Sequence, residues 1–350
     1  MKNILKKLIG ETSKFAVGDD HNNSDIDYYL HETYEPIASY RLAEKLNIEE
    51  KPLHAKELFY KAFSLKPDIC RWVLQANHPN HKYLFPGIRP EEKQDYCPLC
   101  GGKDGLPHWC YSLMDLKAQY VQRFNPVRLW MRCEACNHLY AEEFPKNEPS
   151  ITSPSHNKSD YAMKTNISMF RYYSEILNKL YEITKGKELL EIGIGGSECA
   201  LIAQELGYNV FGIDISNENV QQALRYGIKA EVHDFVLFEP RQKWDIIILG
   251  DVLEHVSDPI HTIQKLQSIL NKNGAIWIST PNFESAVATV RGHNDQMRRV
   301  ANHRNYFSRH SLYRLLERLN FRPIDYQIST HYNGSMEVIA VKGSVSTPNN

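Results

Sequence analysis

A glycine-rich turn between two short apolar segments constrains this chain more than any other feature. The first segment, Leu189–Ile192, has the length and the Leu and Ile content of a strand buried in a parallel sheet. Gly193 and Gly195 follow it, and glycine allows the backbone to bend tightly and to approach a ligand closely. The second apolar segment, Asn209–Ile213, ends at Asp214, about twenty residues beyond the turn. This order of strand, turn, helix, strand and acid predicts a nucleoside site in which the Asp214 carboxylate accepts hydrogen bonds from ribose hydroxyls.

Two residues narrow the choice of nucleoside. The dinucleotide-binding fingerprint has Gly or Ala three residues after its second glycine, and Glu198 stands there instead. Glu191, just before the turn, has a carboxylate suited to an ammonium or sulfonium rather than to a pyrophosphate. Glu191, Gly193 and Gly195, with Ser197 in place of the last glycine, resemble motif I of the class I S-adenosylmethionine-dependent methyltransferases. The alternative, a structural turn without a ligand, is disfavoured by the acid at the right distance.

Strands and helices continue to alternate after the second segment, which predicts an α/β fold with a doubly wound, mostly parallel sheet covered on both faces. The resemblance implies seven strands, and further strands are expected at 230–233, 244–249 and 274–279. Ligands of such sheets bind beyond the carboxyl ends of the strands, so polar residues there should converge. By resemblance, Asp234 would bond the adenine amino group beside Phe235, and the segment from Asp251 would border the methionine moiety.

Glu254 and His255 are the predicted catalytic residues. Methyl transfer is an in-line displacement, so an enzyme mainly aligns donor and acceptor and excludes water. A hydroxyl or an acidic carbon must also lose a proton, and an imidazole titrates near neutral pH. Glu254 would orient His255 or contact the substrate. The pair resembles a motif shared by the ubiquinone-biosynthesis-like branch and by sugar C-methyltransferases; the alternative for His255 is a structural bond to a backbone carbonyl.

The C-terminal part extends the resemblance. The segment His303–Leu312 precedes a predicted helix with leucines on one side, and strands are expected at 326–329 and 335–341. This arrangement resembles the closing region of the ubiquinone-biosynthesis-like branch, and the resemblance covers roughly residues 160–343. The basic segment Arg291–His310 predicts either a lid that grips a phosphate or carboxylate on the acceptor or a solvated loop.

Two Cys-x-x-Cys pairs predict a metal site formed by four thiolates: Cys97, Cys100, Cys133 and Cys136. Each pair can sit on a turn so that its two sulfurs converge on one ion, and four sulfurs in a tetrahedron select zinc. Four protein ligands leave no open position, so this zinc would be structural. A redox role is the disfavoured alternative.

These features divide the chain into four predicted parts. Residues 1–92 form a helical region in which Leu42 to Pro67 resembles one tetratricopeptide hairpin, either packed on the rest of the protein or recruiting a protein partner. Residues 93–145 form the zinc-binding module, 146–160 a linker rich in Pro, Ser and Asn, and 161–343 the methyltransferase domain.

Composition limits the remaining possibilities. A formal net charge of -1 in 350 residues argues against nucleic-acid binding through overall charge. No apolar run is long enough for a membrane span, and Met1–Ala16 lacks the apolar core of a signal peptide, so a cytoplasmic location is expected. Three hypotheses follow: a methyltransferase for a hydroxyl or activated carbon of a small molecule, such as a nucleotide-linked sugar or secondary metabolite with an acidic or phosphorylated group; an RNA methyltransferase that docks RNA through the zinc module; and a non-catalytic cofactor-binding scaffold.

Overall fold

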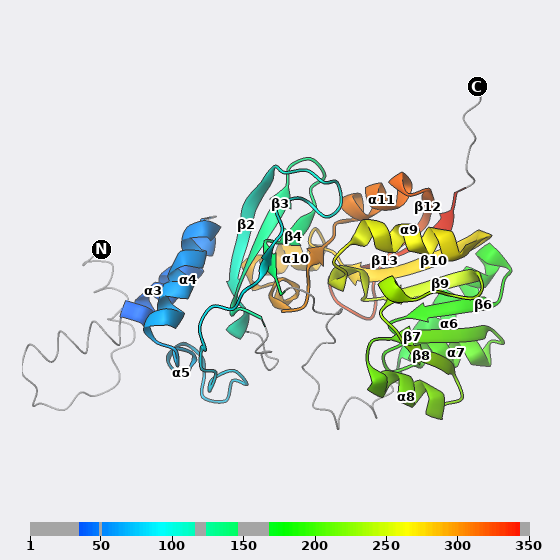
Figure 1. Cartoon of the computed structure of the whole chain (residues 1–350), viewed down its shortest axis with the longest axis horizontal. Coiled ribbons are helices and arrows are strands. Elements are labelled where there is room, and N and C mark those ends of the chain that lie inside the picture. Colours follow the sequence, from blue (N-terminus) through cyan, green and yellow to red (C-terminus); the bar gives the residue numbers. More distant parts are fainter. Residues whose placement is uncertain (1–34, 49–50, 116–123, 146–167, 344–350) are drawn as a thin grey trace, which may run out of the picture. The chain divides into compact units, whose positions relative to one another are not determined.

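The computed structural model describes residues 35–48, 51–115, 124–145 and 168–343 (Figure 1). The chain divides into two compact units: Met1–Glu91 with Pro107–Trp130, and Glu92–Leu106 with Met131–Asn350. The four cysteines therefore belong to the same unit as the glycine turn. The predicted linker at 146–160 lies outside the described residues, and the four domain limits stay predictions.

The first unit contains a helical hairpin where the sequence predicts helices. Helices α3 (Glu35–Ile48) and α4 (Pro52–Leu65) pack against each other, followed by α5 (Cys70–Val73). Ala43, Ala55 and Ala62 are fully buried, and such small side chains let two helices approach closely. Strands β2 (Gly105–Ser112) and β3 (Val127–Cys133) are shared between the two units, and the short 3-10 helix η2 (Leu113–Asp115) follows β2.

The second unit is built on a seven-stranded sheet with the order β12-β13-β10-β9-β6-β7-β8. All its strands run parallel except β13, which pairs antiparallel with both β10 and β12. The strands are β6 (Glu188–Ile192), β7 (Asn209–Asp214), β8 (Lys229–Val232), β9 (Trp244–Gly250), β10 (Leu270–Pro281), β12 (Phe321–Ile328) and β13 (Ser335–Lys342). The predicted α/β fold with a doubly wound, mostly parallel sheet is confirmed.

Helices cover both faces of this sheet because alternate strand residues point to opposite sides. Ile246 and Ile248 pack with α6 (Ser168–Thr184) and α7 (Glu198–Glu205), whereas Ile247 and Leu249 pack with the other helical layer. The remaining helices are α8 (Asn217–Arg225), α9 (Pro259–Ile269), α10 (Ala286–Arg291) and α11 (Arg309–Arg318), with 3-10 turns η3 (Phe235–Leu237), η4 (Leu253–His255), η5 (Gly292–Asn294) and η6 (Gln296–Arg299). Burial on both faces explains why the strands are continuous apolar runs.

The edge strand β12 corrects one prediction. The sequence predicts a strand only from Tyr326, but β12 begins at Phe321 and includes Pro323. Its pairing with β13 is irregular between Pro323 and Asp325. A proline lacks the N–H that a central strand must donate, so it is tolerated at an edge or at an irregularity.

The cysteine segments join the sheet region through short strands. β1 (Glu92–Lys93) pairs with β5 (Glu143–Phe144), and β4 (Leu139–Ala141) pairs with β11 (Asn305–Tyr306). A four-stranded sheet with the order β11-β4-β3-β2 results. A strand from far along the chain thus extends the sheet that carries the second cysteine pair. Among the described residues, no helix is both long and apolar enough to cross a membrane.

Candidate functional site

The glycine turn after β6 has the backbone that its sequence predicts. Gly193, Gly195 and Ser197 have φ angles of 76°, 48° and 69°, in the left-handed region that favours glycine. A Cβ atom at Gly193 would lie 2.7 Å from Cγ2 of Val252, so no side chain fits there. A Cβ at Gly195 would meet no atom closer than 3.9 Å. The backbone at Gly195 therefore borders open space, as a ligand-binding turn requires.

Asp214 is fixed in place at the end of β7. One carboxylate oxygen accepts hydrogen bonds from the Gly195 N–H (3.1 Å) and from Nδ2 of Asn219 (3.1 Å). The other accepts from the Ser216 N–H at 2.7 Å. These bonds orient the carboxylate beside the glycine turn, where the sequence predicts a ribose contact.

Asp234 and Phe235 lie at the end of the neighbouring strand β8. Asp234 begins the turn η3, and its carboxylate accepts from the Val236 N–H at 2.9 Å. Phe235 is buried, with the ammonium of Lys265 5.4 Å from the centre of its ring. The structure thus places both residues at the same sheet edge as Asp214, next to the strand that Asp214 terminates.

Glu191 is a buried carboxyl beside the turn. Burial raises its pKa well above the ordinary value, and the charges of Glu198 and Asp214 raise it further. Among the described residues, Oε2 of Glu191 and Oγ of Ser197 are buried without a hydrogen-bond partner. A cation placed here would offset the cost of a buried carboxylate. The site therefore fits the sulfonium or ammonium of S-adenosylmethionine better than it fits a pyrophosphate.

Asp251 and Glu254 lie beyond β9. Asp251 has a φ of 52°, which is strained for a residue with a side chain. Its backbone N–H donates to the Ser279 carbonyl (3.0 Å), and its carboxylate accepts from Oγ of Ser279 (3.2 Å). Burial first, and then the charge of Glu254, raises the pKa of Asp251 to about 7. Glu254 accepts from Oγ1 of Thr280 at 2.9 Å, and burial raises its pKa to about 7.

His255 has a defined tautomer. Its Nδ1 lies 3.0 Å from the Asn302 carbonyl oxygen, which can only accept, so Nδ1 carries the proton and Nε2 keeps the lone pair. Burial lowers the pKa of His255, which keeps the ring neutral at pH 7. The bond to a backbone carbonyl, expected as a structural alternative, thus leaves Nε2 available as a base.

A second imidazole, missed by the sequence as a site residue, lies beside His255. The rings of His255 and His303 are 4.9 Å apart, and Nδ1 of His303 is 3.1 Å from the Met297 carbonyl. One ligand atom each from Glu254, His255 and His303 lies within 4.8 Å of the others. Two imidazoles and one carboxylate are also a donor set for a divalent metal. In the sequence, His303 belongs to the Arg291–His310 segment, for which a lid is one prediction, but it is not connected there with His255.

The structure of the basic segment Arg291–His310 contradicts one of the two predictions made for it, the solvated loop. Arg298 and His303 are buried, and the Arg304 guanidinium lies 3.9 Å from the centre of the Phe144 ring. Only the ends of the segment are exposed. The hypothesis of a solvated basic loop is therefore wrong for its middle part, and the lid stays a prediction.

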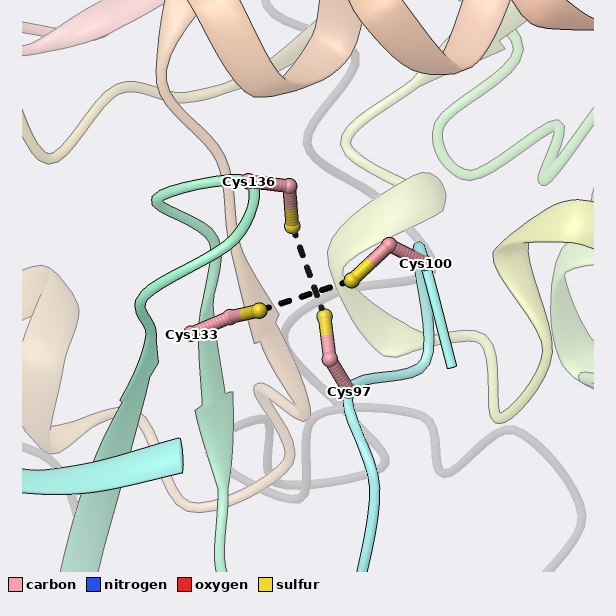
Figure 2. Close-up of side chains that lie close together, drawn as sticks. All are labelled: Cys97, Cys100, Cys133 and Cys136. Atoms are coloured by element: carbon pink, nitrogen blue, oxygen red, sulfur yellow. Dashed lines mark hydrogen bonds between the residues drawn. The ribbon is translucent and has the colours of Figure 1, made fainter. Parts of the chain in front are cut away.

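The four cysteines converge from two separate segments. Figure 2 shows their sulfurs pointing toward one centre, with one pair on the cyan ribbon and the other on the green ribbon. Sγ of Cys97 is 3.6 Å from Sγ of Cys136, and Sγ of Cys100 is 3.4 Å from Sγ of Cys133. All four lie within 4.8 Å of one another. A tetrahedron with Zn–S bonds of about 2.3 Å has edges of about 3.8 Å, so the cluster has the size of a zinc site.

The two cysteine turns have the same backbone. The N–H of Cys97 donates to Gly102 O (2.8 Å), and the N–H of Gly101 donates back to Cys97 O (2.9 Å). In the second turn, Cys133 N–H donates to His138 O (2.9 Å) and Asn137 N–H to Cys133 O (2.9 Å). The fifth residue of each turn is left-handed, with φ of 73° at Gly101 and 58° at Asn137. Gly and Asn are the residues that adopt this conformation most readily.

The pKa values of the clustered thiols depend on one another. A hydrogen bond from Cys97 lowers the pKa of Cys136 to about 5, whereas burial raises that of Cys100 to about 11. Without a cation, only part of the four cysteines would therefore be deprotonated at pH 7. A divalent ion would compensate the charge of four thiolates, so the donor set fits zinc.

The sheet order, the glycine turn and the acid beyond it are the arrangement expected from the sequence for an S-adenosylmethionine-dependent methyltransferase. Residues 166–326 match the family model described as a methyltransferase domain. This part of the chain is therefore similar to the methyltransferase domain family. The predicted family resemblance is confirmed for that part of the chain.

Two known proteins with similar sequences are named as methyltransferases. A ubiquinone biosynthesis O-methyltransferase of Actinobacillus pleuropneumoniae is 30% identical over 109 residues, covering 28% of this chain and 47% of that protein. One from Pelagibacter ubique is 32% identical over 124 residues, covering 32% and 52%. The chain spans about half the length of these curated relatives. A solved magnesium protoporphyrin IX methyltransferase from Synechocystis, with bound SAH, is 18% identical with a TM-score of 0.43, covering 51% of this chain and 84% of that one.

Proposed function

We propose that this protein transfers the methyl group of S-adenosylmethionine to a hydroxyl or an activated carbon of a small molecule. The observation that carries the proposal is the neutral imidazole of His255, whose Nδ1 is bonded to a carbonyl and whose Nε2 lone pair lies beyond β9. A hydroxyl or acidic carbon needs such a base, since its proton must leave as the new bond to carbon forms. Its lowered pKa keeps His255 unprotonated at neutral pH.

The cofactor would lie across the carboxyl ends of β6, β7 and β8. Asp214 would accept from the ribose hydroxyls, and Asp234 from the adenine amino group, with Phe235 beside the ring. Glu191 and Asp251 would face the positive charge of the methionine part, because Glu191 is a buried carboxyl just before the turn and Asp251 precedes Val252, which contacts Gly193. S-adenosylmethionine supplies an electrophilic methyl group, and the chain's own residues hold it in line and take up the acceptor's proton.

The acceptor would lie on the other side, over β9 and β10, where His255 and Glu254 stand. Glu254 is held by Thr280 and lies with Oε1 4.0 Å from Nε2 of His255. It would stabilise His255 once the imidazole has accepted a proton. The acceptor is thus expected to present its reacting atom to Nε2. An acidic or phosphorylated group on the acceptor stays a prediction.

The four-cysteine cluster would hold a structural zinc ion. All four positions of a tetrahedron are filled by Cys97, Cys100, Cys133 and Cys136, so no position is left for a reacting group. The support for zinc is the distance between the sulfurs, the shared turn geometry and the chemistry of the donor set.

The test uses purified protein, methyl-labelled S-adenosylmethionine, and whole or desalted cell extract, followed by separation of small molecules, RNA and protein. We expect label in the small-molecule fraction, lost on desalting and lost again with His255→Gln. Label in nuclease-sensitive material would instead favour an RNA methyltransferase. Binding of the cofactor without label in any fraction, across extracts from several growth conditions, would favour a non-catalytic scaffold, with protein partners of the N-terminal helices as the next search.

A further inference from the structure

We infer that His138 and Asn305 are positioning residues of the active site, which join the second cysteine turn to the backbone that holds His255. The inference rests on the proposed function for the role of His255 as a base. The link itself rests on hydrogen bonds within one compact unit. His138 and Asn305 are among the most deeply buried polar residues of the chain, with relative exposures of 0% and 1%.

The link begins at the cysteine turn. His138 closes the turn that holds Cys133 and Cys136, because its carbonyl accepts from the Cys133 N–H at 2.9 Å. Its ring reaches the partner strand β11, where Nε2 lies 3.1 Å from Oδ1 of Asn305. The ring also lies 4.9 Å from the ring of Phe307. One residue thus contributes its backbone to the turn and its side chain to the active-site side.

Asn305 carries the link to the segment after β9. Its Nδ2 donates to the Val256 carbonyl at 2.8 Å, so its Oδ1 is the acceptor and Nε2 of His138 is the donor. The oxygen of the buried Asn305 amide therefore bonds His138, and its nitrogen bonds the Val256 carbonyl. Burying an imidazole and an amide costs desolvation, which is recovered only if the bonds are made with good geometry. Such a pair fixes one arrangement of the two segments more strictly than an apolar contact would.

Backbone hydrogen bonds also connect the segment after the cysteine turn with the segment after β9. In the β4–β11 pair, Asn305 lies opposite Tyr140, and Ala141 N–H donates to Arg304 O at 2.9 Å. On its other side, Arg304 N–H donates to Glu254 O at 2.9 Å. The segment of residues 302–305 is thus held between the cysteine turn and the catalytic segment.

This segment also supplies the acceptor that sets the tautomer of His255. The Asn302 carbonyl, three residues before Asn305, lies 3.0 Å from Nδ1 of His255. If the segment moves, that acceptor moves with it. The proton can then pass to Nε2, which would remove the lone pair that takes the acceptor's proton. Asn305 and His138 would act on catalysis through His255, without touching the cofactor.

The test reads the tautomer of His255 directly, by NMR of protein labelled with ¹⁵N-histidine. The signal of His255 is assigned by its absence in His255→Gln. We expect a single tautomer protonated at Nδ1 in the wild type, and a shift toward Nε2 protonation in Asn305→Ala and His138→Leu. His138→Gln, which keeps an N–H donor, should restore the wild-type tautomer. Glu134→Ala is the matched control, because Glu134 lies in the same cysteine turn and its side chain is exposed.

Kinetics give a second reading. Asn305→Ala should lower kcat by about 10-fold to 100-fold, the range for residues that orient a functional group, with S-adenosylmethionine affinity within about twofold. Equal losses in kcat and cofactor affinity, or an unchanged His255 tautomer in both broken variants, would overturn the inference. The tautomer is measured without an acceptor. A shifted tautomer in a protein that methylates nothing would therefore refute the proposed function and leave the link standing.

Discussion

The proposed cofactor side and the proposed acceptor side of this site are built in different ways. The cofactor side comes from one continuous stretch, in which Gly193 N–H donates to Ile213 O (2.8 Å) and Gly195 N–H donates to Asp214. The acceptor side is assembled across long distances: His255 and Asn302 are 47 residues apart, and His138 and Asn305 are 167 apart. A site formed by one continuous stretch should tolerate mutations elsewhere in the chain. A site formed by distant segments should lose function when any one of those segments moves. The two sides should therefore respond separately to mutation.

The largest expected effect is on the acceptor side, from His255→Gln. Loss of a general base costs about 10²-fold to 10⁴-fold in kcat. Because His255 is proposed to act on the acceptor, the dissociation constant for S-adenosylmethionine in calorimetry should stay within about twofold. The wild-type rate should fall at acidic pH with a midpoint below the ordinary histidine pKa of about 6.5, since burial lowers the pKa of His255.

The control for this variant is addition of a chelator followed by excess magnesium or manganese. A wild-type rate that returns only with the divalent ion would assign Glu254, His255 and His303 to a metal instead of a base. A His255→Gln protein that keeps the wild-type rate would remove the residue from the mechanism altogether.

Cys97→Ser tests the link between the cysteine cluster and the acceptor side. Loss of one thiolate should lower zinc affinity by more than about 100-fold, so metal analysis should find little zinc in the purified variant. We expect a lower melting temperature and a reduced kcat, with cofactor affinity largely retained. Cys199→Ser is the comparison: this buried cysteine lies in α7 outside the cluster, and its variant should keep full zinc. Full zinc occupancy in Cys97→Ser would exclude Cys97 as a ligand.

Asp214→Ala is the corresponding change on the cofactor side. Removing a carboxylate that accepts from ribose hydroxyls costs about 1.5–3 kcal/mol, or roughly 10-fold to 100-fold in affinity. The zinc content should not change, because the Asp214 carboxylate accepts from Gly195, Ser216 and Asn219, none of which belongs to the cysteine turns. Glu231→Ala, exposed on the adjacent strand β8, should bind the cofactor normally. Unchanged affinity of Asp214→Ala would contradict the ribose assignment.

Local features of the sequence predicted the backbone of the glycine turn, the position of Asp214 beside it and the convergence of the four cysteines. The run Leu189–Ile192, the glycines and the acid at Asp214 carry their meaning within about twenty-five residues, because strand burial, positive φ and a βαβ unit are local requirements. The two Cys-x-x-Cys pairs are equally explicit, since each turn is specified by the short segment that contains it.

The acceptor side could be predicted only in part. Glu254 and His255 were found from their own short motif, but His303, Asn305 and His138 were not connected to them. Composition left two possibilities for the basic residues of Arg291–His310, a lid over the active site or a solvated loop. In the structure Arg298 packs in the interior near Asp295, with Nε 3.5 Å from the carboxylate. Strand pairs such as β4 with β11 join segments that no local pattern relates.

The smallest effect we predict lies where the two sides meet, at Asp251. Burial raises the pKa of Asp251 to about 7, so this carboxyl is mostly neutral below that pH and charged above it. A cation binds the charged form better. S-adenosylmethionine affinity should therefore rise with pH up to about 7 and level off above it, by at most about tenfold per pH unit. Calorimetry across this range measures the slope.

S-adenosylhomocysteine separates the sulfonium from the rest of the cofactor, because it keeps the adenosine and the ammonium but lacks the sulfonium charge. Its affinity should change less with pH, and Asp251→Asn should make the two curves parallel. The unliganded protein should show the opposite trend: a carboxyl with a raised pKa stabilises the fold at low pH, and this stability is lost as pH rises through about 7. Asp251→Asn should remove that loss. If the affinities of the two ligands change with pH in parallel in the wild type, the sulfonium does not lie near Asp251. Glu191 would then be the carboxylate that faces the positive charge of the cofactor, and the cofactor side would be formed by an even shorter stretch of the chain.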